Sequence, residues 1–241
     1  MKFRAFAAAF VVLGGSFAAA AVTALPSTLD QLINLGNTGV TIGDKTFYDF
    51  TYLSTSVPAA SVNVVQAPGS NIGLEFQFSW SASAGNSEDS TIRYKVHVND
   101  TTPTQQLITG VGLSFNGTTS SNNTDLGTNA NVVETIDDLS GNPLGQISVV
   151  NFGPNNSSFN HNSNTFTLTT PTRDLLLVKD IMVHSTTNNG AGTATVSTVD
   201  NSFQQTTTTT TVPLPPAALT GFGTIALGIA TFGRGRFRRW L

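Results

Sequence analysis

Two segments of the chain, 73–80 and 91–99, alternate hydrophobic and polar residues without a break. In each segment large apolar side chains occupy every second position, and polar or charged side chains occupy the positions between them. A repeat of two places successive side chains on opposite faces of a strand, and one buried face with one solvated face is typical of antiparallel sheets. Both segments are therefore predicted to be antiparallel β-strands.

Similar but shorter patterns, separated by stretches rich in Gly, Asn, Ser and Pro, predict eight further strands. These are residues 45–52, 61–65, 108–115, 131–136, 147–152, 165–169, 175–184 and 192–199. In the first of them, Tyr48, Phe50 and Tyr52 are expected to share one face, and 84–90 is expected to be a turn. Ten strands with almost no helix predict an all-β, antiparallel β-sandwich or jelly-roll domain.

One short helix is predicted before the first strand. Ser27 or Thr28 can cap its start, apolar residues then follow helical spacing for about two turns, and Gly36 ends it. No other segment has convincing helical periodicity within the body of the chain.

The N-terminal residues 1–24 have the order of a secretory signal peptide. Lys2 and Arg4 precede an uncharged apolar stretch, and small residues follow. Val22-Thr23-Ala24 provides a cleavage site, with 19–21 as the alternative. Removal of this segment would leave a β-domain over 25–205 that begins outside the inner membrane.

The C-terminal residues 212–241 consist of three parts. A proline-rich motif comes first, an apolar stretch over 217–232 predicts a transmembrane helix, and a basic cluster ends the chain. The motif and the cluster are formed by Val212, Pro213, Leu214, Pro215, Pro216 and Ala217, and by Arg234, Arg236, Arg238 and Arg239. Six threonines over 206–211 precede the tail and are expected to form an extended spacer.

This three-part tail resembles the PEP-CTERM class of bacterial sorting signals, in the variant that reads V-P-L-P-A. Pro216 is an extra proline before the alanine, which leaves the processing position open. The resemblance implies recognition by an exosortase-type membrane enzyme, an inner-membrane-anchored precursor, and a mature form at the cell surface or in an extracellular, exopolysaccharide-containing matrix. The alternative is a plain membrane anchor that is never processed.

The charge distribution limits the partners of the body. Six of the 11 basic residues lie near the termini, so the region between them has 5 basic and 14 acidic residues, a net charge of −9. Binding to nucleic acid requires a basic patch, and this excludes DNA and RNA as expected partners. The absence of cysteine excludes disulfides and thiolate chemistry.

Carboxylates are the main candidates for a catalytic or metal-binding site. A hydrolase would need two acids facing each other across a cleft, and the candidates are Glu75, Glu88, Glu134, Asp137 and Asp138. Asp137 and Asp138 precede a glycine-containing turn and also give a weak calcium candidate. A structural turn is the preferred interpretation, so no cofactor is expected apart from weakly bound Ca²⁺.

Histidines and serines add no recognisable catalytic set. His97, His161 and His184 lack the spacing of a metal site and are expected on the surface. No Gly-x-Ser-x-Gly elbow is present. The sequence therefore predicts a non-enzymatic surface or matrix protein. One alternative is a carbohydrate-binding module that uses Trp80 or the aromatic residues of 47–52, and a secreted hydrolase is the other.

Overall fold

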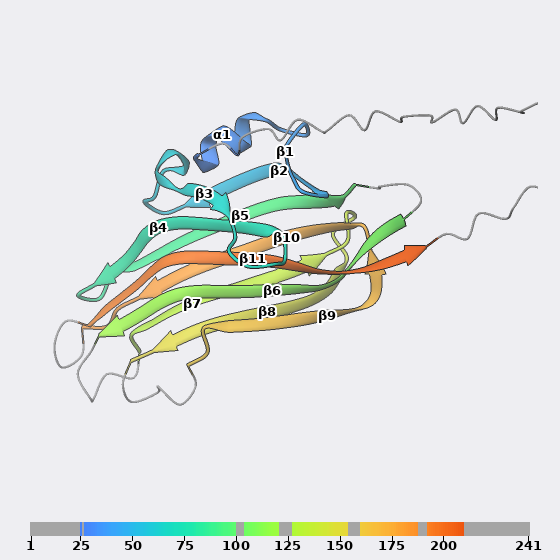
Figure 1. Cartoon of the computed structure of the whole chain (residues 1–241). Helices are drawn as coiled ribbons and strands as arrows, with labels where there is room; N and C mark the ends of the chain where they lie inside the picture. The colour runs from blue at the N-terminus through green and yellow to red at the C-terminus, as the bar shows by residue number, and fades with distance from the viewer. Residues whose placement is uncertain are drawn as a thin grey trace, which may run out of the picture.

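In the computed structural model, two antiparallel sheets pack face to face (Figure 1). The structure describes residues 25, 27–99, 104–120, 127–153, 160–187 and 192–209. The predicted signal peptide and sorting tail lie outside the described residues. The all-β class is confirmed for the described part of the chain, in which one short α-helix precedes the strands.

In both sheets, strands that are far apart in the sequence lie next to each other. The six-stranded sheet has the order β1-β2-β5-β10-β7-β8, and the five-stranded sheet has the order β3-β4-β11-β6-β9. The six-stranded sheet contains β1 (Val40–Ile42), β2 (Lys45–Ser54), β5 (Ser87–Val98), β10 (Asp174–His184), β7 (Asn129–Asp137) and β8 (Pro143–Phe152). The five-stranded sheet contains β3 (Asn63–Gln66), β4 (Gly73–Ser83), β11 (Thr193–Thr209), β6 (Thr104–Ser120) and β9 (Ser163–Thr172).

Side chains from the inner faces of both sheets form one apolar core. The ring of Phe47 on β2 lies 6.2 Å from that of Tyr94 on β5 and 5.9 Å from that of Phe203 on β11, measured between centroids. Because Phe203 belongs to the opposite sheet, these contacts join the two layers. Burial of such rings supplies most of the driving force for this packing.

Helix α1 (Leu29–Asn34) covers one side of the sandwich beside β2 and β3 (Figure 1). Its buried residues are Leu29 and Leu32. The backbone N–H of Ser27 donates to Oε1 of Gln31 at 3.0 Å, and Gly36 follows the helix with a φ of 53°. The predicted helix and its glycine stop are confirmed. A single 3₁₀ turn, η1 (Ala59–Ser61), precedes β3.

All ten predicted strands are present, and most are longer than predicted. The short β1 was not predicted. The predicted turn at 84–90 is wrong in its second half, because β5 begins at Ser87. The register continues there as a regular ladder, in which Ser87 pairs with His184 and Ser90 with Ile181 of β10. This pairing places Glu88 and Asp89 in a strand rather than in a turn.

Strand β2 contains a bulge that changes which aromatic side chains are buried. Asp49 has a φ of 53°, and the register with β5 shifts between Tyr48 and Thr51. A bulge inserts one extra residue and reverses the alternation beyond it. Phe47 and Phe50 are therefore the buried pair, and the prediction that Tyr48, Phe50 and Tyr52 share one face is wrong.

The threonine run is partly structured. Thr206–Thr209 continue β11 and pair with residues 104–107 of β6, where the sequence predicted an unpaired spacer. Threonine is β-branched and favours extended backbone, so the run extends the ladder once β6 lies beside it. The part of the predicted spacer beyond Thr209 lies outside the described residues.

Candidate functional site

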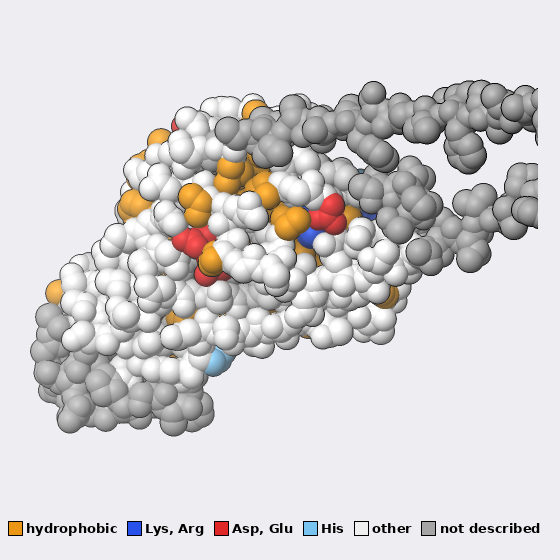
Figure 2. All heavy atoms as spheres, in the orientation of Figure 1, with side chains coloured by type: hydrophobic (Ala, Val, Ile, Leu, Met, Phe, Trp, Pro, Cys, Tyr) orange, Lys and Arg blue, Asp and Glu red, His pale blue; other side chains and the backbone are white. Residues whose placement is uncertain are grey.

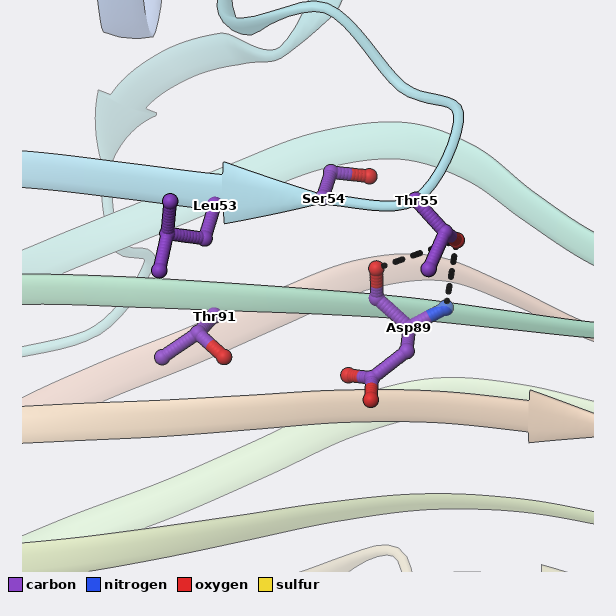
Figure 3. A pocket seen from close by; sticks show the side chains of 5 residues that line it. All are labelled: Leu53, Ser54, Thr55, Asp89 and Thr91. Carbon is purple, nitrogen blue, oxygen red and sulfur yellow. Dashed lines mark hydrogen bonds between the residues drawn. The ribbon is translucent and has the colours of Figure 1, made fainter.

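An open depression lies on the outer face of the six-stranded sheet, where β2 ends beside β5 (Figure 3). It holds about 270 Å³ and is lined by Leu53, Ser54, Thr55, Asp89 and Thr91. The lining combines one apolar side chain with hydroxyl groups and a carboxylate. The sequence did not predict this combination as a site.

The backbone fixes the position of the acid in this depression. The N–H of Thr55 donates to the carbonyl oxygen of Asp89 at 3.0 Å, and the N–H of Asp89 donates to Oγ1 of Thr55 at 3.3 Å. The carboxylate of Asp89 points away from Thr55 (Figure 3). The backbone of Asp89 is therefore fixed by Thr55, and its carboxylate can accept hydrogen bonds from a ligand.

A second carboxylate, that of Asp180, comes from the neighbouring strand β10. Asp180 pairs with Thr91, and Asp89 pairs with Met182, so the two acids occupy diagonal positions on one face. Partial desolvation, and then the hydrogen-bonding and repulsive effects of Asp89, raise the pKa of Asp180 to about 6. The raised pKa of Asp180 is expected for a carboxylate that is partly desolvated beside a second carboxylate, because like charges resist being ionised together.

Leu53 supplies the apolar part of the depression and is 76% exposed. An apolar side chain this exposed gains no stability from burial in the folded monomer. Its position beside Asp89 and Thr91 gives a ligand both a non-polar contact and several hydrogen-bonding groups. A few convergent polar groups around an apolar contact are typical of small-molecule and sugar sites.

The opposite sheet carries a similar acid pair in a different environment. Glu75 on β4 and Asp200 on β11 are direct cross-strand neighbours on the outer face of the five-stranded sheet. Oδ2 of Asp200 accepts a hydrogen bond from Oγ of Ser114 at 3.1 Å. Burial, followed by the effects of Glu75, raises the pKa of Asp200 to about 6. On the face of the molecule that Figure 2 shows, acidic and basic side chains are few.

Glu134 is excluded as a surface acid because it lies in the core. Its carboxylate forms a fully buried ion pair with Lys179 of β10, and it also accepts a hydrogen bond from Nδ2 of Asn201 at 2.8 Å. Lys179 and Tyr94 both donate to Oδ1 of Asn201, the latter at 2.5 Å. Burial raises the pKa of Tyr94 well above its usual value, so its hydroxyl remains a donor. This network is a structural element between the sheets.

Glu88, another of the predicted hydrolase acids, is hydrogen-bonded to neighbouring serines. Glu88 accepts hydrogen bonds from Oγ of Ser54 at 3.4 Å and from Oγ of Ser56 at 2.6 Å. The predicted hydrolase acids are therefore dispersed over both sheets and the core. The acids that do come together are Asp89 with Asp180 and Glu75 with Asp200.

The turn after β7 uses its own carboxylate. Oδ1 of Asp138 accepts from the backbone N–H of Ser140 at 2.8 Å and of Asn142 at 2.9 Å, and Oδ2 accepts from Nδ2 of Asn142 at 2.7 Å. These hydrogen bonds lower the pKa of Asp138, whereas burial and the charge of Asp138 raise that of Asp137. Within the described ranges no group of three or more His, Asp and Glu residues is arranged to hold a metal ion. The weak calcium site remains a prediction.

The three histidines lie apart and have separate partners. Nδ1 of His97 lies 2.7 Å from Oδ1 of Asp174, and Nδ1 of His184 lies 2.7 Å from Oγ of Ser87. Nε2 of His161 lies 3.0 Å from the carbonyl oxygen of Ser148. The structure does not bring the three side chains together.

The aromatic residues proposed for carbohydrate binding are mostly in the core. Trp80 is fully buried and donates from Nε1 to Oγ of Ser90 at 3.1 Å, and Phe47 and Phe50 are also buried. Tyr48 remains partly exposed, with Nζ of Lys95 5.8 Å from its ring centroid. The hypothesis of an aromatic platform built on Trp80 is therefore wrong.

The residues of the sorting signal, Val212 to Ala217 and the four terminal arginines, lie outside the described residues. Of the helices in the described ranges, none has the length and apolar character needed to cross a bilayer. The predicted transmembrane segment 217–232 is not among them. The sorting assignment therefore stays a prediction from the sequence.

Two of the comparisons with known proteins, against family models and against curated proteins, gave no match. Among solved structures, the chain is similar to TmCBM61 in complex with β-1,4-galactotriose, with 9% identity over 75% of this chain and 100% of that one, and a TM-score of 0.33. It is also similar to tailspike protein 4 of bacteriophage CBA120, with 13% identity, 68% and 20% coverage, and a TM-score of 0.27. An isomalto-dextranase of Arthrobacter globiformis T6 complexed with panose has 12% identity, 66% and 23% coverage, and a TM-score of 0.26.

The chain spans about a fifth of the length of the last two proteins. At these identities and TM-scores, none of the three likenesses bears on what this chain binds. The class that the described residues define is an antiparallel β-sandwich with a mixed apolar and acidic depression on one outer face.

Proposed function

We propose that this protein is an exported, non-enzymatic surface or matrix protein that binds a neutral polysaccharide at the depression between β2 and β5. The observation that carries the proposal is the placement of exposed Leu53 beside Thr91 and the acid pair Asp89 and Asp180. A sugar ring offers an apolar C–H face and several hydroxyl donors. Hydrogen bonds from such donors to a carboxylate are among the stronger ones in proteins.

The net charge of the body favours a neutral polymer over an anionic one. With a net charge of −9 between the basic termini, the body repels polyuronates and other acidic chains. The lining of the depression contains one carboxylate, that of Asp89, and no cation, and a second carboxylate, that of Asp180, lies on the neighbouring strand. An uncharged glucan, galactan or mannan is therefore the class of ligand that we expect.

The arrangement of the acids supports binding rather than hydrolysis. A glycosidase places its two carboxylates on either side of the scissile bond. Asp89 and Asp180 instead lie at diagonal positions on adjacent strands of one face. This geometry offers acceptors to a ligand that lies across the sheet.

Binding can be tested by affinity electrophoresis of the full chain in gels that contain a neutral polysaccharide. We expect Asp89→Asn and Leu53→Ser each to weaken binding roughly five- to tenfold, since each removes one contact worth about 1 kcal/mol. Glu75→Gln is the matched control, because it removes the same charge from the acid pair on the opposite sheet.

Three outcomes of this experiment would contradict the proposal. Equal weakening by Asp89→Asn and Glu75→Gln would indicate a general effect of charge. Binding to a polyuronate in preference to the neutral polymers would contradict the ligand class. Release of new reducing ends by the wild-type chain, lost in Asp89→Asn, would favour the hydrolase alternative.

The proposed export and sorting by an exosortase-type enzyme have a separate test. Intact mass and peptide mapping of the protein from its native host, after separation of membrane, envelope and medium, should show the loss of 1–24 and a new C-terminus within 212–217. The mature body should be found in the envelope or the medium. A retained tail in the inner membrane would instead establish a simple anchored protein and exclude the sorting proposal.

A further inference from the structure

Strand β11 is longer than the strand beside it. Its pairing with β4 ends where Ser202 meets Gly73, whereas its pairing with β6 continues to Thr209 (Figure 1). Among the described residues, the β4 side of Gln205–Thr209 therefore has no strand partner. We refer to this segment as the β11 edge.

The first residue of the β11 edge, Gln205, is hydrogen-bonded to the side chains of Asp44 and Lys45. Fully buried Lys45 donates from Nζ to Oε1 of Gln205 at 2.5 Å and to Oδ1 of Asp44 at 2.9 Å. Nε2 of Gln205 donates in turn to Oδ2 of Asp44 at 2.7 Å. A strand fixed at its base loses little conformational entropy when it acquires a partner.

Several other strand edges of the sandwich are covered or blunted. The segment before α1 pairs with β3, since the N–H of Val64 donates to the carbonyl oxygen of Ser27 at 3.0 Å. The β8 edge forms a bridge between Val150 and His161. Strand β9 contains Pro171, which lacks an N–H, and β1 has only three residues. Short strands, prolines and covering segments are the usual protections against pairing between molecules.

Within the described part of the chain, the β11 edge has none of these protections. It contains no charged residue and no proline, and the side chains of Thr206, Thr207 and Thr208 are exposed. The register shift at this level places the extra residue in β6, so β11 itself stays regular. An uncharged, regular strand whose N–H and C=O groups on one side have no strand partner among the described residues is a template for another strand.

We infer that the β11 edge pairs in antiparallel fashion with the β11 edge of a second copy of this chain. An antiparallel pair of identical strands is two-fold symmetric, so each copy contributes the same surface. A run of threonines is also self-complementary, because a shift in register again places threonine opposite threonine. Cross-strand threonine pairs are favourable, and the same sheet contains one in Thr118 and Thr195, whose Oγ1 atoms lie 2.6 Å apart.

The charge of the body gives this association a distinctive salt dependence. Two bodies of net charge −9 repel each other, whereas the segments that pair are uncharged. Salt screens the repulsion over about 10 Å at 0.1 M and leaves backbone hydrogen bonds largely unaffected. The association should therefore strengthen as salt is added, the opposite of what attraction between charged patches would give. The inference is independent of the proposed polysaccharide site.

Cysteine cross-linking provides the test, because the chain has no cysteine of its own. The full chain carrying Thr207→Cys should form a disulfide-linked dimer under mild oxidation, with a yield that rises with salt. Thr193→Cys is the matched control. Thr193 is an exposed threonine of the same strand, but Ser83 and Ser120 flank it on both sides.

A charge at the edge gives the second measurement. Thr207→Lys should weaken self-association at least tenfold by light scattering after gel filtration, since like charges would face each other across the two-fold axis. Thr193→Lys should leave self-association unchanged. Circular dichroism of each variant establishes that the sandwich is folded.

Any of three results would overturn the inference. Equal cross-linking of Thr207→Cys and Thr193→Cys would show that the copies meet through another surface, such as the apolar tail. Monomeric wild-type protein at all salt concentrations, or dimers indifferent to Thr207→Lys, would show that the β11 edge does not pair with itself.

Discussion

Replacement of Lys179 by alanine is expected to lower the free energy of unfolding by about 3–5 kcal/mol. Lys179 and Glu134 form a fully buried ion pair between β10 and β7. Removal of the ammonium group leaves the carboxylate of Glu134 in the core without its cation, and Asn201 also loses a donor. An unpaired charge in an apolar interior is among the most destabilising changes that a single substitution can produce.

Urea denaturation of the full chain, followed by circular dichroism at pH 7, measures this loss. Lys95→Ala is the matched control, because Lys95 forms a partly exposed ion pair with Asp49 at 2.9 Å. That variant should lose less than about 1 kcal/mol. The double variant Lys179→Met with Glu134→Leu should recover most of the stability, since apolar residues of similar volume often replace a buried ion pair at little cost. Equal losses for Lys179→Ala and Lys95→Ala would contradict the buried placement.

The melting temperature is expected to rise as the pH falls from 7.5 to 5. The pKa values of Asp180 and Asp200 are each raised to about 6, whereas an unfolded aspartate titrates near 3.8. Between these values the folded state binds more protons than the unfolded state. The contribution of these two aspartates to stability is therefore fully present below about pH 4 and is lost as the pH rises through their folded-state pKa of about 6.

The size of this effect is limited by solvent. Both side chains retain contact with water, so we expect about 1 kcal/mol for each pair after screening, or roughly 4–8 °C in total for a domain of this size. Differential scanning calorimetry across the pH range measures it. The double variant Glu75→Gln with Asp89→Asn should lose most of the slope and melt at pH 7.5 near the wild-type value at pH 5. A wild-type melting temperature that falls steadily between pH 7.5 and 5 would contradict both raised pKa values.

The depression and its acid pair, Asp89 and Asp180, were not predicted, although the sequence contained part of the information needed to predict them. Asp180 lies in a strand that was predicted correctly, at a position that alternation assigns to the outer face. Asp89 was assigned to a turn, because its segment is rich in small polar residues. Had β5 been extended to Ser87, both acids would have been outward strand residues. Their proximity would still have been unknown, since 91 positions separate them in the sequence.

Lys179 shows the limit of reasoning from residue type. The alternation of β10 places Leu177, Lys179 and Ile181 on the inner face. A lysine is rarely buried unless it is paired. The inner position becomes favourable because the ammonium group of Lys179 donates hydrogen bonds to Glu134 on β7 and to Asn201 on β11.

The sequence by itself determined the class of the domain, the position of its helix and the existence of ten strands. Alternation of apolar and polar side chains is a local property, so it defines which face of a strand is buried before any partner is known. The same sequence also predicts the export and sorting signals on which the proposed location depends.

The tertiary structure alone decided which strands are neighbours and in which register. The pairing of β5 with β10 brings Asp89 to Asp180, and that of β4 with β11 brings Glu75 to Asp200. The bulge at Asp49 and the extension of β11 to Thr209 depend likewise on the strand alongside. Strand order and register follow from packing both sheets around one core, and no local pattern encodes that arrangement.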